Sequence, residues 1–424
     1  MFLIYLIINL AGAVYIGQDL RKINNDNTST DNFTSKTNTI SPYMLNANIN
    51  PLEEAKLILN NIWSSYWNGN GFSASSCGSV NTPVVWDIAV TLQSFADGEQ
   101  QNPNEFTSQL SLVYDYMNLY YNSNKMAYSP SQNKDNDLYY DDNAQIASAL
   151  LTAYNATKDS KYLNRAQNVL QFLEQGWNDK IGGVTWHLGY PYVASISTLE
   201  TALASFRLYK AGGDSSHLAF AEDCMNWIGK NLWDNSTNLI MDGINSDSGD
   251  VNKWTFTYQT GTAISLSTYL YEETKNIKWK NYADTLVESA LDHAKPIYDS
   301  SLPLNYRFWK DGFDFIQLLT EGFSDYLKAG LGNDDVKNEL IREAQYTYTF
   351  AKSSDGLYFN QINPIQNSEV ATNAWNTYSK ESQKSNISNN VYCNGNNGQV
   401  MHDLINDSAV AHLFFKTGVI VSSI

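Results

Sequence analysis

Two adjacent carboxylates, Asp141 and Asp142, are the residues of this chain best placed to act as a nucleophile and an acid. They follow Tyr139 and Tyr140 and open a helical pattern. A retaining glycosidase uses two carboxyl groups about 5 to 5.5 Å apart, one to attack the anomeric carbon and one to transfer a proton. Neighbouring side chains in a first helical turn can span that distance. Asp at a helix start also caps free backbone N–H groups, so the pair alone leaves both interpretations open.

A second Asp-Asp pair provides a comparison for the capping interpretation. Asp334 and Asp335 also open a helical pattern, but their neighbours are Lys337, Asn338 and Glu339. Such surroundings are typical of a solvated helix cap. The surroundings of each pair must therefore decide between capping and catalysis.

Helical periodicity predicts twelve helices in six pairs. Their expected ranges are 51–67, 83–95, 105–121, 141–157, 160–173, 192–211, 215–233, 258–274, 277–298, 312–329, 333–352 and 402–415. A helix end, a polar turn and a second helix recur roughly every 60 residues, a longer period than the about 34 to 47 residues of ordinary helical solenoids. We therefore expect an all-α protein in which six hairpins close into an (α/α)6 barrel over residues 51–424.

The predicted inner and outer helices begin with different residues. Outer helices open with polar turns such as Asp159 to Lys161. The inner helix starts combine aromatic and polar residues: Trp86, Asp87, residues 139–142, Trp186, His187, Tyr190, Tyr192, Trp254, Phe256, Tyr258, Gln259, Tyr306, Phe308, Trp309, Lys310, Asp311 and residues 401–403. In a closed barrel these starts converge on one face, which predicts an aromatic carbohydrate cleft containing the Asp141–Asp142 pair. Asp87, Asp311, His402 and Asp403 also fit ordinary helix starts.

Composition limits the possible partners. The 424 residues are 43% hydrophobic and 13% aromatic, enough for a large core, and the net charge of -17 argues against nucleic acid and anionic membrane surfaces. A neutral polymer is compatible with this charge, and the aromatic residues suit sugar rings. The five histidines lack zinc-type spacing, so we expect no metal and no cofactor.

The N-terminal end of the chain carries a predicted processing signal. An apolar run from Met1 to Val14, with the small residues Ala11, Gly12 and Ala13 near its end, predicts a signal peptide over 1–17 and secretion. Residues 18–50 are rich in Asn, Thr and Ser and predict a flexible leader. Six acceptor sequons, at Asn27, Asn32, Asn155, Asn235, Asn386 and Asn406, fit the secretory pathway. The C-terminal stretch does not resemble a GPI signal. We expect a monomer without stable membrane insertion.

The three cysteines fit an oxidising compartment. Cys77 and Cys393 lie in loop-type sequence near the two ends of the predicted barrel, and they are the expected disulfide if those ends meet. Cys224 lies in a helical pattern and is expected to be a buried free thiol.

The chain resembles glycoside hydrolase family 76, whose members are (α/α)6 barrels that act on α-1,6-linked mannose. The resemblance extends from about Pro51 onward and depends on the motifs at residues 140–144, 182–186 and 254–261. It implies that Asp141 is the nucleophile and Asp142 the general acid/base. The expected substrate-binding residues of the aromatic face are Tyr140, Asn143, Trp86, Trp186, Tyr192, Tyr258, Gln259 and Trp309.

Two motifs depart from the family pattern, and three functions remain open. Family members usually have Tyr-Asn-Gln-Gly where this chain has residues 258–261, and a Lys-Asn pair followed by Ile-Ser/Ala-Asn where it has residues 193–198. The expected function is cleavage of internal α-1,6 bonds in mannan at the cell wall or outside the cell, which the lack of a GPI signal favours. The alternatives are a wall transglycosidase acting on GPI-linked mannan or mannoprotein glycan and a non-catalytic mannan-binding wall protein. Survival of both carboxylates favours catalysis.

Overall fold

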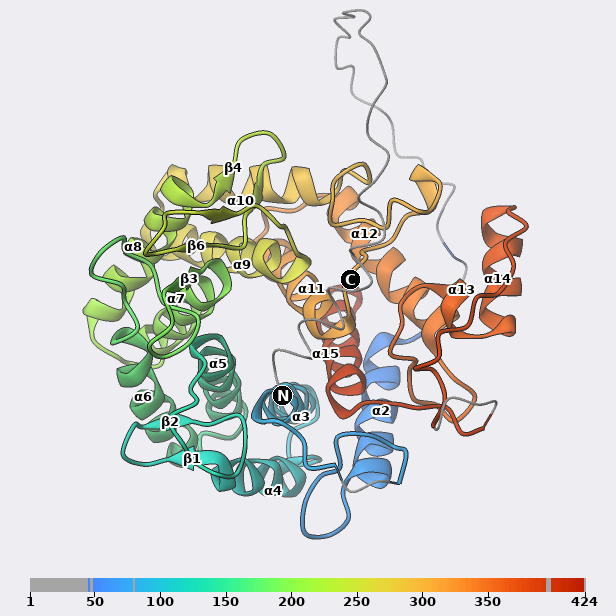
Figure 1. Cartoon of the computed structure of the whole chain (residues 1–424), viewed down its shortest axis with the longest axis horizontal. Helices are drawn as coiled ribbons and strands as arrows, with labels where there is room; N and C mark the ends of the chain where they lie inside the picture. The colour runs from blue at the N-terminus through green and yellow to red at the C-terminus, as the bar shows by residue number, and fades with distance from the viewer. Residues whose placement is uncertain (1–44, 46–48, 79–80, 394–397, 423–424) are drawn as a thin grey trace, which may run out of the picture. The chain divides into compact units, whose positions relative to one another are not determined.

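Twelve helices alternate between an outer and an inner ring in the computed structural model, which describes residues 45, 49–78, 81–393 and 398–422 (Figure 1). The outer helices are α2 (Pro51–Tyr66), α4 (Thr107–Met117), α6 (Ser160–Glu174), α8 (Ser215–Asn231), α10 (Ile277–Ala290) and α12 (Asp334–Tyr346). The inner helices are α3 (Val85–Gln101), α5 (Tyr140–Thr157), α7 (Ser195–Lys210), α9 (Thr257–Thr274), α11 (Phe313–Lys328) and α15 (Leu404–Val421). The predicted signal peptide and residues 18–44 lie outside the described residues.

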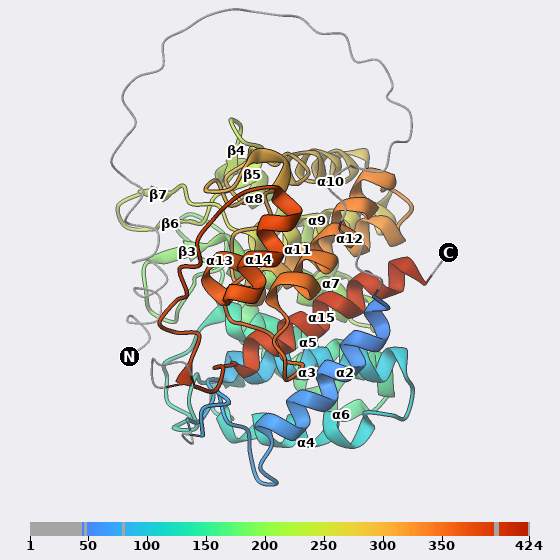
Figure 2. The same ribbon diagram turned by 90° about the vertical axis from the view of Figure 1, so that its right-hand side faces the viewer.

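Each inner helix packs against the next, and the last packs against the first. Contacts run from α3 to α5, α7, α9, α11 and α15 in turn, and α15 returns to α3. Helix α2 packs on α15, so the first outer helix covers the last inner one. The predicted (α/α)6 barrel is therefore confirmed. Figure 1 looks onto the face where the inner helices begin, and Figure 2 shows that face at its left-hand side.

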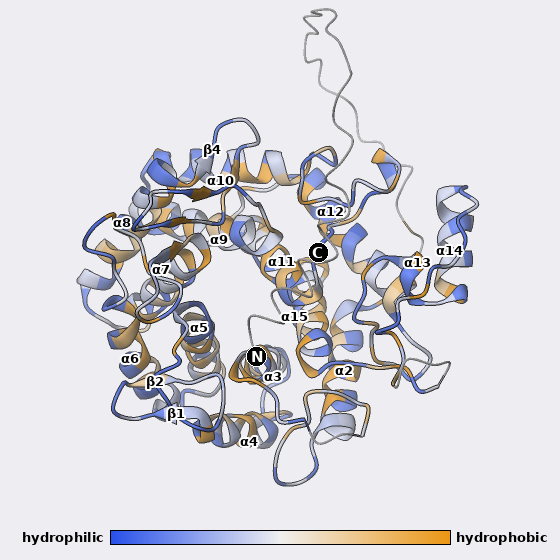
Figure 3. Cartoon of the chain, in the orientation of Figure 1, coloured by the Kyte–Doolittle hydropathy of each residue, from blue (hydrophilic) through white to orange (hydrophobic). Residues whose placement is uncertain are grey.

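Burial distinguishes the two rings. Thirteen of the sixteen residues of α7 are buried, whereas only six of the fifteen residues of α6 are. The outer helices therefore need only one apolar stripe, and hydrophobic and hydrophilic residues alternate along them (Figure 3). By length and composition, helix α15 could cross a membrane. However, 72% of its 18 residues are buried inside the protein.

Five of the six outer helices have the polar start predicted from the sequence, whereas α4 follows Phe106 and has no side-chain cap. Outer helices α2, α6, α8, α10 and α12 begin after Asn50, Asp159, Asp214, Asn276 and Asn333, and each of these side chains accepts a hydrogen bond from a backbone N–H of its helix. At the inner helices, the residue before the helix provides no such bond. The pair Asp334–Asp335 lies on outer helix α12, in the solvated position that the sequence indicates.

Helices α9 and α11 approach closely because each has a glycine at the contact. A Cβ atom on Gly261 would lie 2.2 Å from the carbonyl oxygen of Leu318, and one on Gly322 would lie 2.5 Å from the carbonyl oxygen of Gly261. Neither backbone position has room for a side chain. The glycine of the 254–261 motif therefore serves helix packing.

Several predicted boundaries differ from the structure. Residues 192–194 form a short strand, β3 (Tyr192–Ala194), and helix α10 ends at Ala290 because the chain turns there. Helix α12 passes into a π-helical turn, η4 (Thr347–Ala351). Helices α13 (Pro364–Asn367) and α14 (Glu369–Ser379), and the short 3₁₀ turns η2 (Asn118–Tyr120) and η3 (Leu304–Tyr306), were not expected.

Short antiparallel strands decorate the barrel. Strand β3 pairs with β6 (Gly243–Asn245), which pairs with β7 (Val251–Asn252) to form a three-stranded sheet. Two hairpins are formed by β1 (Tyr121–Asn122) with β2 (Ala127–Tyr128), and by β4 (Trp233–Asp234) with β5 (Leu239–Ile240). The three-stranded sheet leads directly into inner helix α7, so it frames the face where the inner helices begin.

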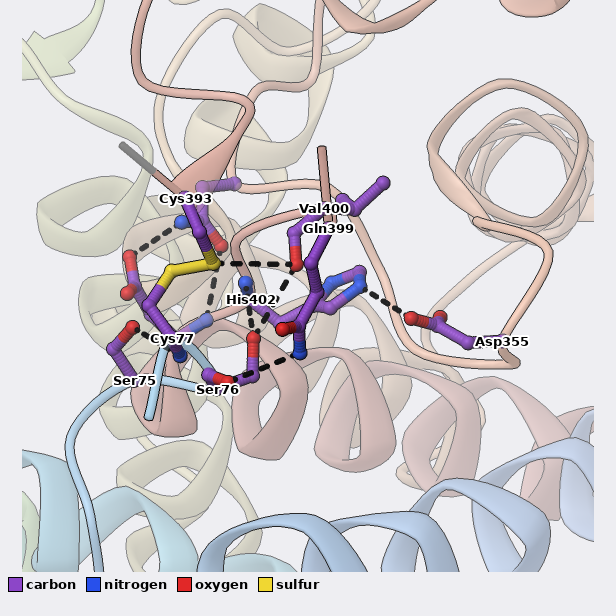
Figure 4. Close-up of a disulfide and its surroundings, with 10 residues drawn as sticks. Ser75, Ser76, Cys77, Asp355, Cys393, Gln399, Val400 and His402 are labelled. Carbon is purple, nitrogen blue, oxygen red and sulfur yellow. Dashed lines mark hydrogen bonds and ion pairs between the residues drawn. A yellow bond between two sulfur atoms is a disulfide. The ribbon is translucent and has the colours of Figure 1, made fainter. Parts of the chain in front are cut away.

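A disulfide joins Cys77 to Cys393, as expected from the sequence, and Cys224 is a buried free thiol. The bridged segments also exchange hydrogen bonds: the Ser76 N–H donates to the His402 carbonyl, and the His402 N–H donates to the Ser76 hydroxyl (Figure 4). The disulfide thus links the segment before α3 to the segment before α15, where the ring of inner helices closes.

Candidate active site

The carboxylates Asp141 and Asp142 lie in the first turn of inner helix α5. The helix begins at Tyr140, one residue earlier than predicted, and its start is fixed by Asn143. The Asn143 side chain accepts from the Tyr128 N–H at 2.7 Å and donates to the carbonyl oxygens of Tyr128 and Tyr139 at 3.0 and 2.7 Å. This anchoring fixes the direction in which both carboxylates leave the helix.

Two hydrogen-bond donors stabilise the ionised form of Asp141. One carboxylate oxygen accepts from the indole N–H of Trp186 at 2.9 Å, and the other accepts from the backbone N–H of Asp142 at 3.1 Å. Burial raises the pKa of Asp141 to about 6, against the opposing effect of these two donors, which favour the ionised form. Asp141 therefore ionises more easily than its burial alone would allow.

The surroundings of Asp142 favour its protonated form. Burial raises its pKa well above the ordinary value, and the charges of Asp141 and Asp87 add to that effect. Among the described residues, no hydrogen-bond donor offsets this rise at the Asp142 carboxyl. The two acids therefore differ in environment: Asp141 loses its proton first and Asp142 retains one to higher pH.

Aromatic side chains from several inner helix starts gather beside the pair. Tyr258 forms a small apolar cluster with Ala194, Ile196 and Leu318, and the half-buried rings packed on this cluster are those of Trp186, Tyr192, Phe256 and Phe315. Trp86 extends the group, since its ring lies 6.0 Å from that of Phe315. The indole N–H of Trp86 donates to Gln145, one turn after Asp141 on α5. Of the predicted sugar-contacting residues, Trp86, Trp186, Tyr192 and Tyr258 thus lie together.

A third carboxylate, Asp242, organises this aromatic group. It accepts from the hydroxyls of Tyr192 and Tyr258 at 2.5 and 3.4 Å, and from the side-chain amides of Asn252 and Gln259, both at 2.9 Å. Burial raises the pKa of Asp242, against the opposing effect of these four donors. The charge of Asp242 in turn raises the pKa of Asp141. Sequence reasoning missed Asp242 because it follows strand β5 and carries no helix-start signal.

Four more aspartates, all half-buried, lie at the starts of inner helices. Burial raises the pKa of Asp87 to about 8, of Asp314 to about 7 and of Asp403 to about 6, and it also raises the pKa of Asp311. Each has a structural partner: for example, Asp87 accepts from the Val84 N–H at 3.0 Å. Asp311 accepts from the N–H and hydroxyl of Thr257 at 2.7 and 2.9 Å. These contacts match the helix-start interpretation.

Ionisable side chains lie further along the inner helices, beyond the turn that holds Asp141 and Asp142. Arg207 donates to Glu321 at 2.9 Å, Lys416 lies 3.0 Å from Glu321 and 3.4 Å from Asp97, and His412 contacts Asp97 at 2.5 Å. Glu321, His412 and Arg207 line a cavity that also reaches Gln145 and Leu318 beside the aromatic cluster. The pairing of Arg207 and Lys416 with Glu321 and Asp97 offsets part of the cost of burying these charges.

Four of the residues predicted to contact sugar are buried in other roles, and these assignments need correction. Tyr140 is 3% exposed and stacks on Phe172 at 4.5 Å. Asn143 and Gln259 are 0% exposed, and their amides are engaged in the contacts described above; Gln259 also accepts from the Phe256 N–H. Trp309 is 0% exposed and packs edge-on against Phe323 in the main core. A helix-start position places these residues near the site face but does not expose them.

The family comparison agrees with this geometry. The sequence model of glycosyl hydrolase family 76 matches residues 52–401. The meiotically up-regulated gene 191 protein of Schizosaccharomyces pombe is 30% identical over 331 residues, which cover 70% of this chain and 73% of that protein. Mannan endo-1,6-alpha-mannosidase DCW1 of Candida albicans is 27% identical over 145 residues, 30% of this chain and 31% of that protein.

Solved structures share the fold. The family 76 alpha-mannanase of Bacteroides thetaiotaomicron superimposes with a TM-score of 0.71 at 20% identity, over 88% of this chain and 96% of that one. A second structure is an inactive alpha-1,6-mannanase variant from Salegentibacter, with two successive aspartates replaced by asparagine and alpha-1,6-mannotriose bound. It superimposes with a TM-score of 0.70 at 19% identity, over 87% of this chain and 99% of that one. Dfg5 of Chaetomium thermophilum, in complex with glucosamine, superimposes with a TM-score of 0.65 at 15% identity, over 90% of this chain and 93% of that one.

Proposed function

Because the chain belongs to glycosyl hydrolase family 76, we propose that it is a secreted, retaining glycosidase that cleaves internal α-1,6-mannosidic bonds of mannan. The observation that carries the proposal is the half-buried Asp141–Asp142 pair, with an indole bound to one acid and none of the described donors offsetting the raised pKa of the other. The inactive Salegentibacter variant, which lacks two successive aspartates and carries alpha-1,6-mannotriose, supports the same pair and the same linkage.

The two acids divide the reaction between them. A carboxylate oxygen of Asp141 attacks C1 of the mannose residue and forms a covalent ester, while the bond from C1 to the departing oxygen breaks. Asp142 gives its proton to that oxygen, so the shortened chain leaves as an alcohol. Asp142, now ionised, then removes a proton from water, whose oxygen bonds to C1 as the ester to Asp141 breaks. Two inversions at C1 give net retention.

The disulfide supports secretion. Disulfides persist in oxidising compartments and are rare in the cytosol, so Cys77–Cys393 fits a protein that passes through the secretory pathway. The proposed substrate, mannan, and the proposed secretion together place the activity outside the cell or at the cell wall.

The test is incubation of the purified protein with unbranched α-1,6-mannan, with new reducing ends as the readout. We expect release by the wild type and a loss of at least about a thousandfold for Asp141→Asn. A matched control replaces Asp334 and Asp335 with Asn on outer helix α12, which should retain activity. NMR of the first-formed product should show the α-anomer.

Two other outcomes would replace the proposal. Products longer than the substrate, formed in the presence of a glucan acceptor, would indicate that a sugar hydroxyl rather than water releases the ester, as in a transglycosidase. Equal signal from the wild type and Asp141→Asn, together with retained binding of mannan, would leave a non-catalytic mannan-binding protein.

A further inference from the structure

Trp254 is the one exposed indole among the eleven tryptophans of the chain, all of which lie within the described residues. Its side chain is 49% exposed, whereas the other ten are buried or half-buried. Trp254 follows strand β7 and precedes inner helix α9, so it lies at the face where the inner helices begin. A large aromatic side chain left in water at this position needs an explanation other than core packing.

The indole is continuous with the aromatic group beside the acid pair. Its ring lies 6.2 Å from that of Phe256, and the Phe256 ring stacks at 5.5 Å on Tyr258 and lies 5.8 Å from Phe315. Trp186, which donates to Asp141, packs on the same cluster as Phe256. A series of rings therefore runs from Trp254 through Phe256 to Tyr258 and Phe315, and it ends on the apolar cluster that also carries the Trp186 indole bound to Asp141.

Hydrogen bonds fix the segment that presents Trp254. The Trp254 backbone N–H donates to the side-chain oxygen of Asn252 at 3.2 Å, and the side-chain amide of Asn252 donates to Asp242 at 2.9 Å. Asp242 also binds Tyr192, Tyr258 and Gln259 at the site. The position of the exposed indole is thus tied, through one side chain, to the carboxylate that organises the aromatic group.

A second exposed ring lies on the opposite arm of the same sheet. Tyr190 is 53% exposed, lies 6.3 Å edge-on from Trp186, and precedes strand β3. Val251, 39% exposed, lies on strand β7 three residues before Trp254. The β3–β6–β7 sheet therefore carries apolar surface at both of its outer strands, next to the acid pair.

We infer that Trp254 is a remote sugar-binding platform that holds the α-1,6-mannan chain beyond the residues that flank the cleaved bond. This inference rests on the proposed function, because it names the same glycan as ligand. The apolar face of a sugar ring packs on a flat, exposed indole, and a ring fixed by its backbone loses little freedom on binding. The protein consequently discriminates long chains from short ones.

The experiment compares long and short ligands in a protein that cannot turn them over. With Asp141 and Asp142 both replaced by Asn, binding of unbranched α-1,6-mannan and of α-1,6-mannotriose is measured with and without Trp254→Ala. We expect the preference for the polymer over the trisaccharide to fall about 3- to 10-fold. Trp254→Phe should keep most of the preference, because it retains a flat ring. Ile277→Ala, at a 60% exposed side chain on α10, should change nothing.

Each remaining outcome overturns the inference in a recognisable way. An unchanged preference in Trp254→Ala, with polymer binding intact, rejects the platform and leaves the proposed function standing. An equal loss of polymer and trisaccharide binding shows that Trp254 acts through the local fold, which circular dichroism and the melting temperature would also report. Absence of mannan binding by the parent protein rejects the platform and the proposed function together.

Discussion

The indole nitrogen of Trp186 donates a 2.9 Å hydrogen bond to a carboxylate oxygen of Asp141, across 45 positions of the chain. The contact is supported by backbone pairing, since the Tyr140 N–H donates to the Trp186 carbonyl at 2.9 Å. A donor aimed at one acid of the pair and not at the other separates their roles. The assignment of Asp141 as nucleophile and Asp142 as acid depends on this asymmetry.

Replacing Trp186 with Phe keeps an aromatic ring and removes the N–H donor. Because the donor stabilises the ionised form, its loss raises the pKa of Asp141. In a plot of kcat/KM against pH, the rise on the acidic side (the acid limb) should therefore move to higher pH. Activity should fall about 10- to 100-fold. Trp177→Phe, at an indole that packs on Phe220 instead, should leave the limb in place. A fall in activity without any movement of the limb would contradict the role assigned to the hydrogen bond.

The fold should be more stable at mildly acidic than at alkaline pH. Burial raises the pKa of Asp87, Asp314 and Asp403 to about 8, 7 and 6. A raised folded-state pKa gives stability that is complete below the unfolded value of about 4 and is lost as the pH rises through the folded value. The melting temperature should therefore fall between pH 5 and pH 8.

Asp87→Asn tests the largest of these shifts. The substitution removes the charge but can still accept the Val84 N–H, so we expect a higher melting temperature than the wild type at pH 8 and little difference at pH 5. The opposing group, Glu339, has its pKa lowered because burial is outweighed by Arg342, so its contribution is lost only at pH values well below this range. Identical melting temperatures for the variant and the wild type at pH 8 would argue against this mechanism.

The disulfide should stabilise the closed ring. Cys77 and Cys393 are separated by 316 residues and join the segments before α3 and α15. Loss of a cross-link that closes so long a loop, in a Cys77→Ser/Cys393→Ser variant, should lower the free energy of unfolding by about 2–4 kcal/mol. Denaturant titration measures this change. Dithiothreitol should destabilise the wild type and leave the double variant unaffected; equal sensitivity of both proteins would point to a target other than this bond.

Much of the architecture follows from sequence because the signals are local or periodic. Apolar spacing identifies the helices, and the side chains that open them separate a capped outer start such as Asp159 from an uncapped inner start such as Tyr139. Burial of individual positions does not follow. Successive residues of a helical turn point about 100° apart, so Tyr140 turns into the core while Asp141 remains at the site.

Residues positioned by tertiary contacts were beyond sequence reasoning. Asp242 lies between strands β5 and β6 and gains its role from four donors that other segments supply. Phe315 joins the aromatic cluster from the first turn of α11, where the periodic pattern marks it only as apolar. Helix α14 was missed because its eleven residues lie in an Asn- and Ser-rich stretch that is typical of a loop.

Asp242→Asn should shift the acid limb in the direction opposite to Trp186→Phe. The charge of Asp242 raises the pKa of Asp141, so its removal lowers that pKa and moves the limb to lower pH. The amide also turns an N–H₂ group toward donors such as Tyr192 and Asn252, which should lower the free energy of unfolding by about 1–3 kcal/mol and raise KM as the aromatic group loosens. Asp250→Asn, at an exposed carboxylate on the β6–β7 turn, is the matched control and should do neither. Movement of the limb to higher pH in Asp242→Asn would show that the carboxylate is protonated in the native site and acts there as a hydrogen-bond donor.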